Sequence, residues 1–190
     1  MQHLDLMNDL ELLSVVLSGK VTESGLRDAF RLQQGEKVTP AKQAKFDALQ
    51  LLMKRQGQAR IKELVGNVLS QSRRVFLPYK EKFAGEKKEH FHALYLDSKN
   101  RVVKEELISI GSLNFSIVHP REVFKPAVEI SATSIILVHN HPSNDPTPSQ
   151  EDIAMTKRLV EVGKIMGIEI LDHIIIGGDV YLSFLEQKLM

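Results

Sequence analysis

Residues 134–152, SIILVHNHPSNDPTPSQED, contain the pattern that decides the fold and the chemistry of this chain. The apolar run 134–138 suits a short strand buried on both faces, and it leads directly into His139. Turn-forming residues fill 142–148, and Ser149 opens a run with apolar residues at helical spacing. This order of strand, loop and helix indicates an α/β domain.

The sequence on either side of this segment extends the same domain. Upstream, two runs of alternating residues joined by a Ser-Lys-Asn turn predict a β-hairpin, and Pro120 in a first helical turn predicts a helix. Downstream, two apolar runs separated by Gly-Gly-Asp predict two further strands. The expected elements are the strands 90–97, 102–110, 168–176 and 180–184 and the helices 120–128 and 149–167.

The first 85 residues have a different pattern, with apolar residues at helical spacing. Short helices are expected there, most of them bounded by a capping residue, a glycine or a proline. They cover residues 8–19, 22–30, 40–57 and 60–69. We therefore predict a small all-helical region at 1–85 and a mixed α/β domain at 86–190.

The composition excludes several classes of protein. The chain has 190 residues, 43% of them apolar, and no cysteine, so it has neither a disulfide framework nor a thiolate metal site nor a cysteine nucleophile. Any metal must then bind to His and carboxylate side chains. No apolar stretch approaches the about eighteen residues of a membrane span, and residues 1–17 carry acidic side chains where a signal peptide is basic. These features predict a soluble, cytoplasmic protein without membrane contact.

The formal net charge of +1 hides a basic segment. Between Lys54 and Lys88, ten Lys and Arg side chains face three Glu, which gives ten minus three, or plus seven. Such a segment can neutralise the phosphate charges of DNA. A solvated helical face explains the same charges and is favoured. Aromatic rings are supplied only by Phe76, Tyr79 and Phe83, which argues against a stacking platform for single strands.

His139, His141 and Asp152 form the candidate metal site. Because the side chains of a strand alternate between its faces, two histidines that lie two residues apart point to the same side. Asp152 lies in the first turn of the following helix, so the loop can fold back and bring its carboxylate to the same point. Three protein ligands with an open fourth position are typical of a catalytic zinc ion, which lowers the pKa of a bound water to about 7. The set favours Zn²⁺, while Co, Mn and Fe stay open.

Each part of this pattern also has a structural interpretation. Ser149 and Asp152 have the spacing of a helix N-cap with an acidic first turn, and a His-x-His pair at a strand end often only faces a loop. Capping and metal binding are compatible for these two residues, and the joint occurrence of all parts at fixed offsets favours the metal site. For His173, a satisfied buried histidine is favoured over a group that orients a metal ligand.

The stretch from His139 to Asp152, with His-x-His-Pro followed by Ser and Asp, resembles the JAMM (MPN-type) metallopeptidase motif. Together with residues 118–123 (VHPREV) and 172–177 (DHIIIG), it resembles more closely the RadC family of bacterial JAMM-domain proteins. The resemblance covers about residues 89–185, roughly half of the chain. It implies a JAMM/MPN-like (cytidine-deaminase-like) fold, which is a mixed α/β sheet flanked by helices.

The resemblance also implies roles for two further residues. The family places a glutamate on an earlier strand, where it hydrogen-bonds the water held by zinc, and the matching residue is Glu89. Glu89 would act as general base during attack on a carbonyl and would then pass the proton to the leaving amine. Spacing alone does not distinguish Glu89 from Glu105, Glu106 or Glu122. By the same resemblance, Ser149 would donate a hydrogen bond to the oxyanion or to the water.

The sequence departs from the family pattern at two places. The helical region of RadC proteins, to whose opening residues 8–19 are similar, often carries a helix-hairpin-helix with a Gly-x-Gly hairpin. Gly35 is the only glycine between Leu32 and Leu49, which argues against DNA binding of the hairpin type. Asn144 stands where the family usually has glycine, and asparagine tolerates a left-handed backbone nearly as well.

The leading hypothesis is a RadC-like zinc hydrolase with one Zn²⁺ per chain that cleaves an amide, peptide or isopeptide bond in a peptide or protein substrate. In this hypothesis the metal ligands are His139, His141 and Asp152, and the catalytic residues are Glu89 and Ser149. Two alternatives stay open. The RadC name implies an accessory protein of DNA repair, which the basic segment Lys54–Lys88 supports, and a non-catalytic JAMM scaffold would serve protein contacts.

Overall fold

The computed structural model describes residues 7, 9, 12, 15, 16, 39–69, 71–111 and 118–190. The chain divides into two compact units, residues 1–56 and 57–190, while the division predicted at residue 85 stays a prediction. In the first unit, Leu12, Ala48 and Leu52 are buried together. Most of the predicted helix 8–19 and all of the predicted helix 22–30 lie outside the described residues.

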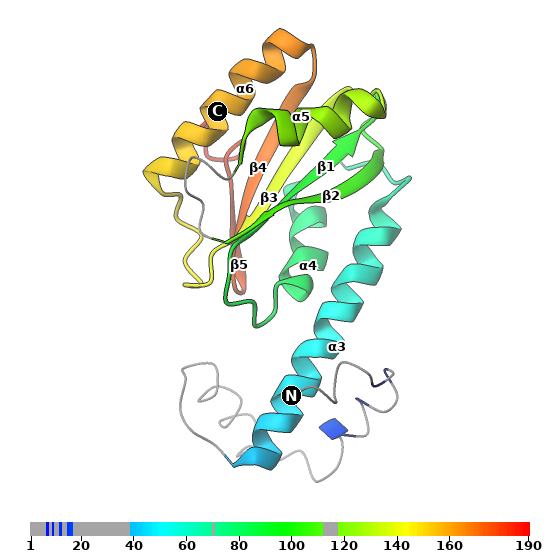
Figure 1. Ribbon diagram of the computed structural model, residues 1–190, viewed down its shortest axis with the longest axis vertical. Coiled ribbons are helices and arrows are strands. Elements are labelled where there is room, and N and C mark those ends of the chain that lie inside the picture. Colours follow the sequence, from blue (N-terminus) through cyan, green and yellow to red (C-terminus); the bar gives the residue numbers. More distant parts are fainter. Residues whose placement is uncertain are drawn as a thin grey trace. The chain divides into compact units, whose positions relative to one another are not determined.

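A five-stranded sheet forms the centre of the second unit, in the order β2-β1-β3-β4-β5 (Figure 1). β1 pairs antiparallel with β2 and β3, β3 pairs parallel with β4, and β4 pairs antiparallel with β5. The strands are β1 (His90–Leu96), β2 (Val102–Ile110), β3 (Ser134–Asn140), β4 (Glu169–Gly177) and β5 (Val180–Ser183). This mixed sheet, flanked by helices, confirms the predicted fold class.

Helices cover both faces of the sheet. α5 and α6 share one hydrophobic core with Phe91 and Leu137, whereas α4 and the part of α3 beyond residue 57 share another with Leu94 and Val138. Burial on both faces explains why β1 is buried along almost its whole length although its sequence alternates. The helices are α3 (Pro40–Leu64), α4 (Ser72–Lys82), α5 (Pro120–Glu129) and α6 (Gln150–Met166).

α3 is one continuous helix of 25 residues, where the sequence predicted two helices separated near Gly57. A Cβ on Gly57 would lie 2.6 Å from the Pro78 carbonyl oxygen, so the missing side chain lets α3 approach the backbone of α4 closely. The prediction of a break is wrong because a glycine needed for helix packing looks the same in a sequence as a glycine that ends a helix.

The sequence does not indicate α4 as a separate element, because Pro78 lies inside it and proline usually marks a helix boundary. The helix forms nevertheless, since its residues Val75, Phe76 and Tyr79 are buried in the core beneath the sheet. Among the helices that the structure describes, none combines the length and the apolar character that crossing a membrane requires.

Candidate metal centre

β3 brings the two histidines of the motif to one face of the sheet. The strand continues through His139 to Asn140, two residues beyond the apolar run seen in the sequence. His139 lies opposite Phe91 of β1 and is fully buried. His141 follows the strand, but its amide still donates to the Ile176 carbonyl of β4 at 2.9 Å. The extended backbone therefore continues past the strand end, and both imidazoles point to the same side, as predicted.

Asp152 reaches the same point because α6 begins there. The Ser149 hydroxyl accepts a hydrogen bond from the Asp152 amide at 3.1 Å, and Asp152 Oδ2 accepts from the Ser149 amide at 2.8 Å and from its hydroxyl at 2.6 Å. These bonds form a capping box, so the helix start that the sequence predicted is confirmed. The other carboxylate oxygen, Oδ1, is buried and has no hydrogen-bond partner among the described residues.

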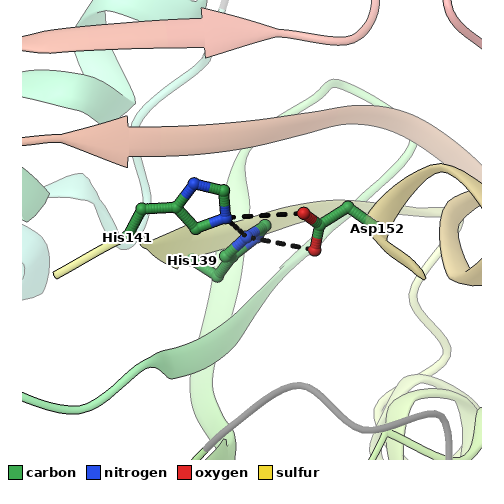
Figure 2. Close-up of side chains that lie close together, drawn as sticks. All are labelled: His139, His141 and Asp152. Atoms are coloured by element: carbon green, nitrogen blue, oxygen red, sulfur yellow. Dashed lines mark hydrogen bonds and ion pairs between the residues drawn. The ribbon is translucent and has the colours of Figure 1, made fainter. Parts of the chain in front are cut away.

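His139, His141 and Asp152 converge at one point (Figure 2). One ligand atom of each residue lies within 4.8 Å of the other two. The Nε2 atoms of the two histidines are 3.0 Å apart. Asp152 Oδ1 lies 3.3 Å from His139 Nε2, and Oδ2 lies 3.4 Å from His141 Nε2. The structure thus brings together the three residues that the spacing singled out.

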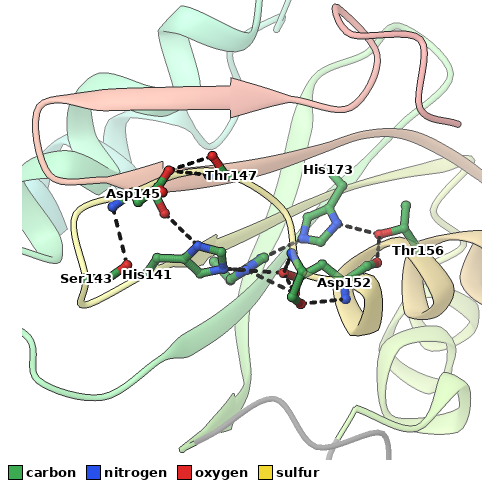
Figure 3. Close-up of polar contacts among 9 residues, drawn as sticks. His141, Ser143, Asp145, Thr147, Asp152, Thr156 and His173 are labelled. Carbon is green, nitrogen blue, oxygen red and sulfur yellow. Dashed lines mark hydrogen bonds and ion pairs between the residues drawn. The ribbon is translucent and has the colours of Figure 1, made fainter.

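The loop after β3 fixes the tautomer of His141. Its Nδ1 lies 2.8 Å from the backbone carbonyl oxygen of Asp145, as Figure 3 shows. A carbonyl oxygen can only accept a hydrogen bond, so Nδ1 carries the hydrogen. In the neutral ring the lone pair is then on Nε2, which faces Asp152.

Packing against the turn between β4 and β5 holds this loop in place. Asn144 has a φ of 64°, in the left-handed region as predicted. A Cβ on Gly177 would lie 2.6 Å from the Pro146 nitrogen and 2.7 Å from the Asn144 carbonyl oxygen. The Asp145 carboxylate accepts from the Thr147 amide at 2.9 Å and from its hydroxyl at 2.6 Å. Because Gly177 has no side chain, the loop and its Asp145 carbonyl can reach this position.

A chain of buried hydrogen bonds fixes the tautomer of His139 (Figure 3). The Thr156 hydroxyl donates to the Asp152 carbonyl at 2.7 Å, so it accepts the hydrogen of His173 Nδ1 at 2.6 Å. His173 Nε2 is then an acceptor, and at 2.8 Å it takes the hydrogen of His139 Nδ1. The lone pair of His139 is therefore on Nε2. His173 is a satisfied buried histidine, and it also orients a candidate ligand.

The protonation of the site follows from burial and from these contacts. Burial lowers the pKa of His139 well below its usual value, and it lowers the pKa of His173 to about 3. Burial also opposes the ionised forms of His141 and Asp152. For His141, the hydrogen bonds with Asp152 and Asp145 outweigh burial and raise the pKa, and the Glu89 charge adds to this rise. For Asp152, the bond from His141 and the bonds from Ser149 together outweigh burial, so the pKa of this carboxyl lies far below its usual range.

These properties fit a divalent cation. When both rings are neutral, their Nε2 lone pairs face each other at 3.0 Å and repel unless a positive charge lies beside them, either a cation or a proton on His141. The adjacent carboxylate is ionised. Asp152 Oδ1 is a buried acceptor without a donor among the described residues, which is the property of a metal ligand seen without its metal. Two imidazole nitrogens and one carboxylate oxygen match the ligand set of a zinc site with an open position.

Glu89 lies beside this site. It directly precedes β1 and is partly exposed. The register of β1 and β3 ends with Phe91 opposite His139, so its continuation puts Glu89 opposite His141. Alternation puts the Glu89 side chain on the face that carries Phe91 and the two histidines, and the Glu89 charge is close enough to act on His141. The general-base role of Glu89 stays a prediction.

The Ser149 hydroxyl donates to Asp152 Oδ2, so its proton is engaged within the capping box. A hydrogen bond from Ser149 to an oxyanion requires this bond to open, and that role also stays a prediction. Sequence reasoning missed Thr156, although it follows Asp152 by four residues and so shares its helix face. It also missed the Asp145 carbonyl, for which a sequence gives no signal because every residue has one.

Comparisons with known proteins identify the family of this chain. The chain matches the family model of the RadC-like JAB domain over residues 69–189. A UPF0758 protein of Methanosarcina acetivorans is 46% identical over 181 residues, which cover 95% of this chain and 78% of the relative. A UPF0758 protein of Methanosarcina mazei is 44% identical over 173 residues, which cover 91% of this chain and 75% of the relative.

Similarity is higher over a shorter segment of a third relative. A UPF0758 protein of Methanococcoides burtonii is 65% identical over 101 residues, which cover 53% of this chain and 44% of the relative. This match therefore spans less than half of that protein. From the family model, which matches more than half of the chain, and from the two Methanosarcina relatives, we conclude that the chain belongs to the RadC family and carries a RadC-like JAB domain.

Proposed function

We propose that this protein is a zinc-dependent hydrolase that cleaves amide bonds of the peptide or isopeptide type. One observation carries the proposal, which is the convergence of two imidazole lone pairs and a carboxylate oxygen without a hydrogen-bond donor. A buried polar atom left without a partner costs about 1–3 kcal/mol, and a bound cation would remove that cost.

A bound divalent cation supplies Lewis acidity, which activates water near neutral pH and polarises a carbonyl oxygen. The ligand atoms would be Nε2 of His139, Nε2 of His141 and Oδ1 of Asp152. Zinc suits this set best, and Co, Mn and Fe accept the same ligands. His139 and Asp152 are buried, whereas His141 is partly exposed, so a substrate approaches from the side of His141.

The proton transfers are assigned to residues at the open side of the site. The partly exposed Glu89 carboxylate is placed to accept a proton from the attacking water and to pass it to the leaving nitrogen. The Ser149 hydroxyl, after turning away from Asp152, would donate to the developing oxyanion. In this proposal Glu89 is the general base and Ser149 is the hydrogen-bond donor to the oxyanion.

A non-catalytic scaffold accounts for the site less well. A surface for protein contacts needs no metal ligands, yet all three ligand side chains are present. Each histidine also has its tautomer set by a dedicated hydrogen bond, which His139 donates to His173 and His141 donates to the Asp145 carbonyl. Such support is typical of metal sites, where the partners of the ligands control their orientation and basicity.

Metal content is the first test of this proposal. We expect the protein reconstituted with zinc to bind one ion per chain, and His139→Ala to lose it. His119→Asn is a matched control, because His119 caps α5 by accepting from the Arg121 amide and asparagine is also a good N-cap. Retention of stoichiometric zinc by His139→Ala would overturn the assignment of the site.

Hydrolysis is the second test. We expect the zinc-loaded protein to cleave members of a fluorogenic library of peptide and isopeptide substrates, to lose activity with a chelator and to regain it with added zinc. Glu89→Gln should keep its zinc but lower kcat by about 100-fold or more, since general-base catalysis contributes about 10² to 10⁴. A zinc-loaded protein that cleaves none of the amide substrates would contradict the proposed function.

A further inference from the structure

Asn140 is the residue between the two histidines of the motif, and it points away from them. It is the last residue of β3 and only 3% exposed. Its Oδ1 accepts a hydrogen bond from the His90 amide at 2.8 Å, and its Nδ2 donates to the Lys88 carbonyl at 3.0 Å. The two backbone partners fix the orientation of the amide, because one can only donate and the other can only accept.

The two groups that Asn140 contacts lie on either side of Glu89. The backbone pairing of β1 with β3 ends at Phe91, so the Asn140 side chain takes over the pairing where the ladder stops. On the other side, the Glu89 carbonyl accepts from the Gly111 amide at 2.9 Å. The backbone at Glu89 is therefore held from both sides although it precedes the strand.

Asn140 ties this segment to the end of β3. Residues 86–89 belong to no helix or strand, and Lys87 and Lys88 are exposed. The Glu89 carboxylate is carried by this segment, so a shift of the backbone changes the point from which the carboxylate reaches the site. A displacement of about 1 Å at a catalytic group can lower a rate about 100-fold, so the position of this backbone bears directly on catalysis.

We propose that Asn140 is a positioning residue that holds Glu89 in place for proton transfer by bonding the backbone on both sides of it. This inference rests on the proposed function, since it assigns Glu89 as the base. The inference gives a reason for asparagine at position 140, between the two candidate histidine ligands. The position needs a hydrogen-bond donor and an acceptor on one short planar group, and asparagine supplies both. Aspartate supplies only the acceptor, and leucine supplies neither.

The test uses the full chain and five variants, one of which is Glu89→Gln alone. Asn140→Leu removes both bonds at similar volume, Asn140→Asp keeps the acceptor for the His90 amide, and Glu89→Gln is combined with Asn140→Leu in a double variant. Ser134→Ala is the matched control, because Ser134 is a buried polar residue at the other end of the same strand and its hydroxyl has no partner among the described residues.

In hydrolysis assays, Asn140→Leu should lower kcat about 10-fold to 100-fold while KM changes little. In the Glu89→Gln background the same substitution should cost less than about twofold, because the group that it positions is already gone. Zinc affinity should stay within about twofold of the original, because the side chain points away from the ligands. Ser134→Ala should leave both quantities unchanged.

A second readout does not depend on hydrolysis. The exchange of the His90 amide hydrogen, followed by NMR, should become faster in Asn140→Leu and stay slow in Asn140→Asp, which keeps the acceptor. The visible absorption spectrum of the Co²⁺-loaded protein should change in Glu89→Gln, and Asn140→Leu should reproduce that change without adding to it in the double variant.

The outcomes separate this inference from the proposed function. If no amide substrate is cleaved but the exchange and Co²⁺ results follow the expectation, the hydrolase proposal fails and the positioning by Asn140 stands. Equal losses from Asn140→Leu with and without Glu89 would overturn the inference. So would a loss of zinc affinity as large as the loss of kcat, because Asn140 would then act on the metal ligands.

Discussion

His173 determines which nitrogen of His139 faces the site, and Thr156 determines the tautomer of His173. We expect His173→Phe to raise the zinc dissociation constant about 10-fold to 100-fold, the usual cost of removing the partner of a metal-binding histidine. The new ring would keep the stacking on Phe184, which lies 4.7 Å away between ring centroids. Thr156→Val should act in the same direction with a smaller effect. Competition with a chromophoric chelator measures both constants.

His119→Asn serves again as the control, because it removes an imidazole elsewhere in the same domain. Its zinc affinity should equal that of the unchanged protein. If His173→Phe also binds zinc with unchanged affinity, the hydrogen-bond chain does not act on His139 and His173 has only a packing role.

The pH dependence of zinc binding follows from His141. Its pKa is raised above the usual 6.5, because the bonds to Asp152 and Asp145 outweigh the effect of burial. Below that pKa a proton occupies Nε2 and competes with the cation, so zinc affinity should fall about tenfold per pH unit as the solution is acidified below it. Asp152 stays ionised throughout, because its pKa is far below this range.

Calorimetry in buffers of different ionisation enthalpy would measure the proton released. We expect the number of protons released per zinc to approach one below the pKa of His141 and to fall toward none well above it. A constant affinity over this range would mean that His141 is already neutral in the metal-free protein.

The three metal-ligand candidates could be found from spacing because each obeys a local rule. Strand alternation pairs the histidines, and helix capping places Asp152. Glu89 could be singled out only by resemblance, since its position depends on the pairing of strands that are distant in sequence. Asn140 was missed for the same reason, because its partners lie about fifty residues away.

At the scale of the elements, Glu105 ties α4 to the sheet. The same oxygen of this β2 carboxylate accepts from Lys82 at 2.8 Å and Tyr79 at 3.2 Å, both on α4, and it pairs with His92 of β1. Burial lowers the pKa of His92, so the neutral ring donates its Nδ1 hydrogen. Burial alone would raise the pKa of Glu105, but the bonds from His92 and Lys82 outweigh it and lower the pKa to about 2.

We expect Glu105→Gln to lower the free energy of unfolding by about 1–2 kcal/mol at pH 7, after allowance for partial exposure to solvent. Because the folded-state pKa lies below the usual 4.5, this contribution is present above about pH 4.5 and is lost as the pH falls toward 2. The difference between the two proteins, measured by urea unfolding, should shrink over that interval.

Glu129→Gln on α5 provides the comparison. Glu129 is exposed and lies 3.9 Å from Lys125, so its removal should change stability by less than about 0.5 kcal/mol at any pH. Equal effects of the two substitutions would show that the Glu105 contacts do not stabilise the packing of α4.

The helices and strands of the α/β domain could be predicted where the apolar periodicity and the end signals of an element agree. The β1–β2 hairpin, α5 and α6 have clear periodicity and clear ends, and the structure has all of them. The extent of α3 and the presence of α4 could not be predicted. In a sequence Gly57 and Pro78 indicate helix breaks, whereas in the structure both residues lie inside helices that pack closely. Tertiary contacts decide between the two outcomes.

At the scale of the whole molecule, the second unit contains all three candidate ligands and both hydrophobic cores of the sheet. We expect residues 57–190 alone to unfold cooperatively and to bind zinc with unchanged affinity. A fragment of residues 86–190 lacks α4 and would expose the core around Leu94 and Val138, so we expect it to be unstable. Thermal unfolding of both fragments also tests the boundary predicted at residue 85.

DNA binding through the basic segment Lys54–Lys88 stays a prediction. At least four of its ten basic side chains form ion pairs with other described residues, which leaves no more than six for phosphates. We therefore expect weak binding of duplex DNA that weakens with salt, with a slope of log affinity against log salt no steeper than about −5. The pairs are Arg55–Asp9, Arg60–Glu81, Lys80–Asp179 and Lys82–Glu105.

Fluorescence anisotropy over a salt series measures this slope. Absence of binding at the lowest salt would remove the accessory role in DNA repair as an explanation of these charges. A slope near −10 would mean that the ion pairs open when DNA binds.

The two oxygens of Asp152 differ in their contacts: Oδ2 accepts the bonds that begin α6 and also lies near His141, whereas Oδ1 lies near His139 and accepts no hydrogen bond from the described residues. An amide in its place would keep the oxygen that starts the helix and would offer an NH₂ group, which cannot ligate, where the cation belongs. Asp152→Asn should therefore abolish metal binding at this site while the surrounding fold stays unchanged. This inactive variant would retain a bound substrate long enough for the substrate to be captured and identified.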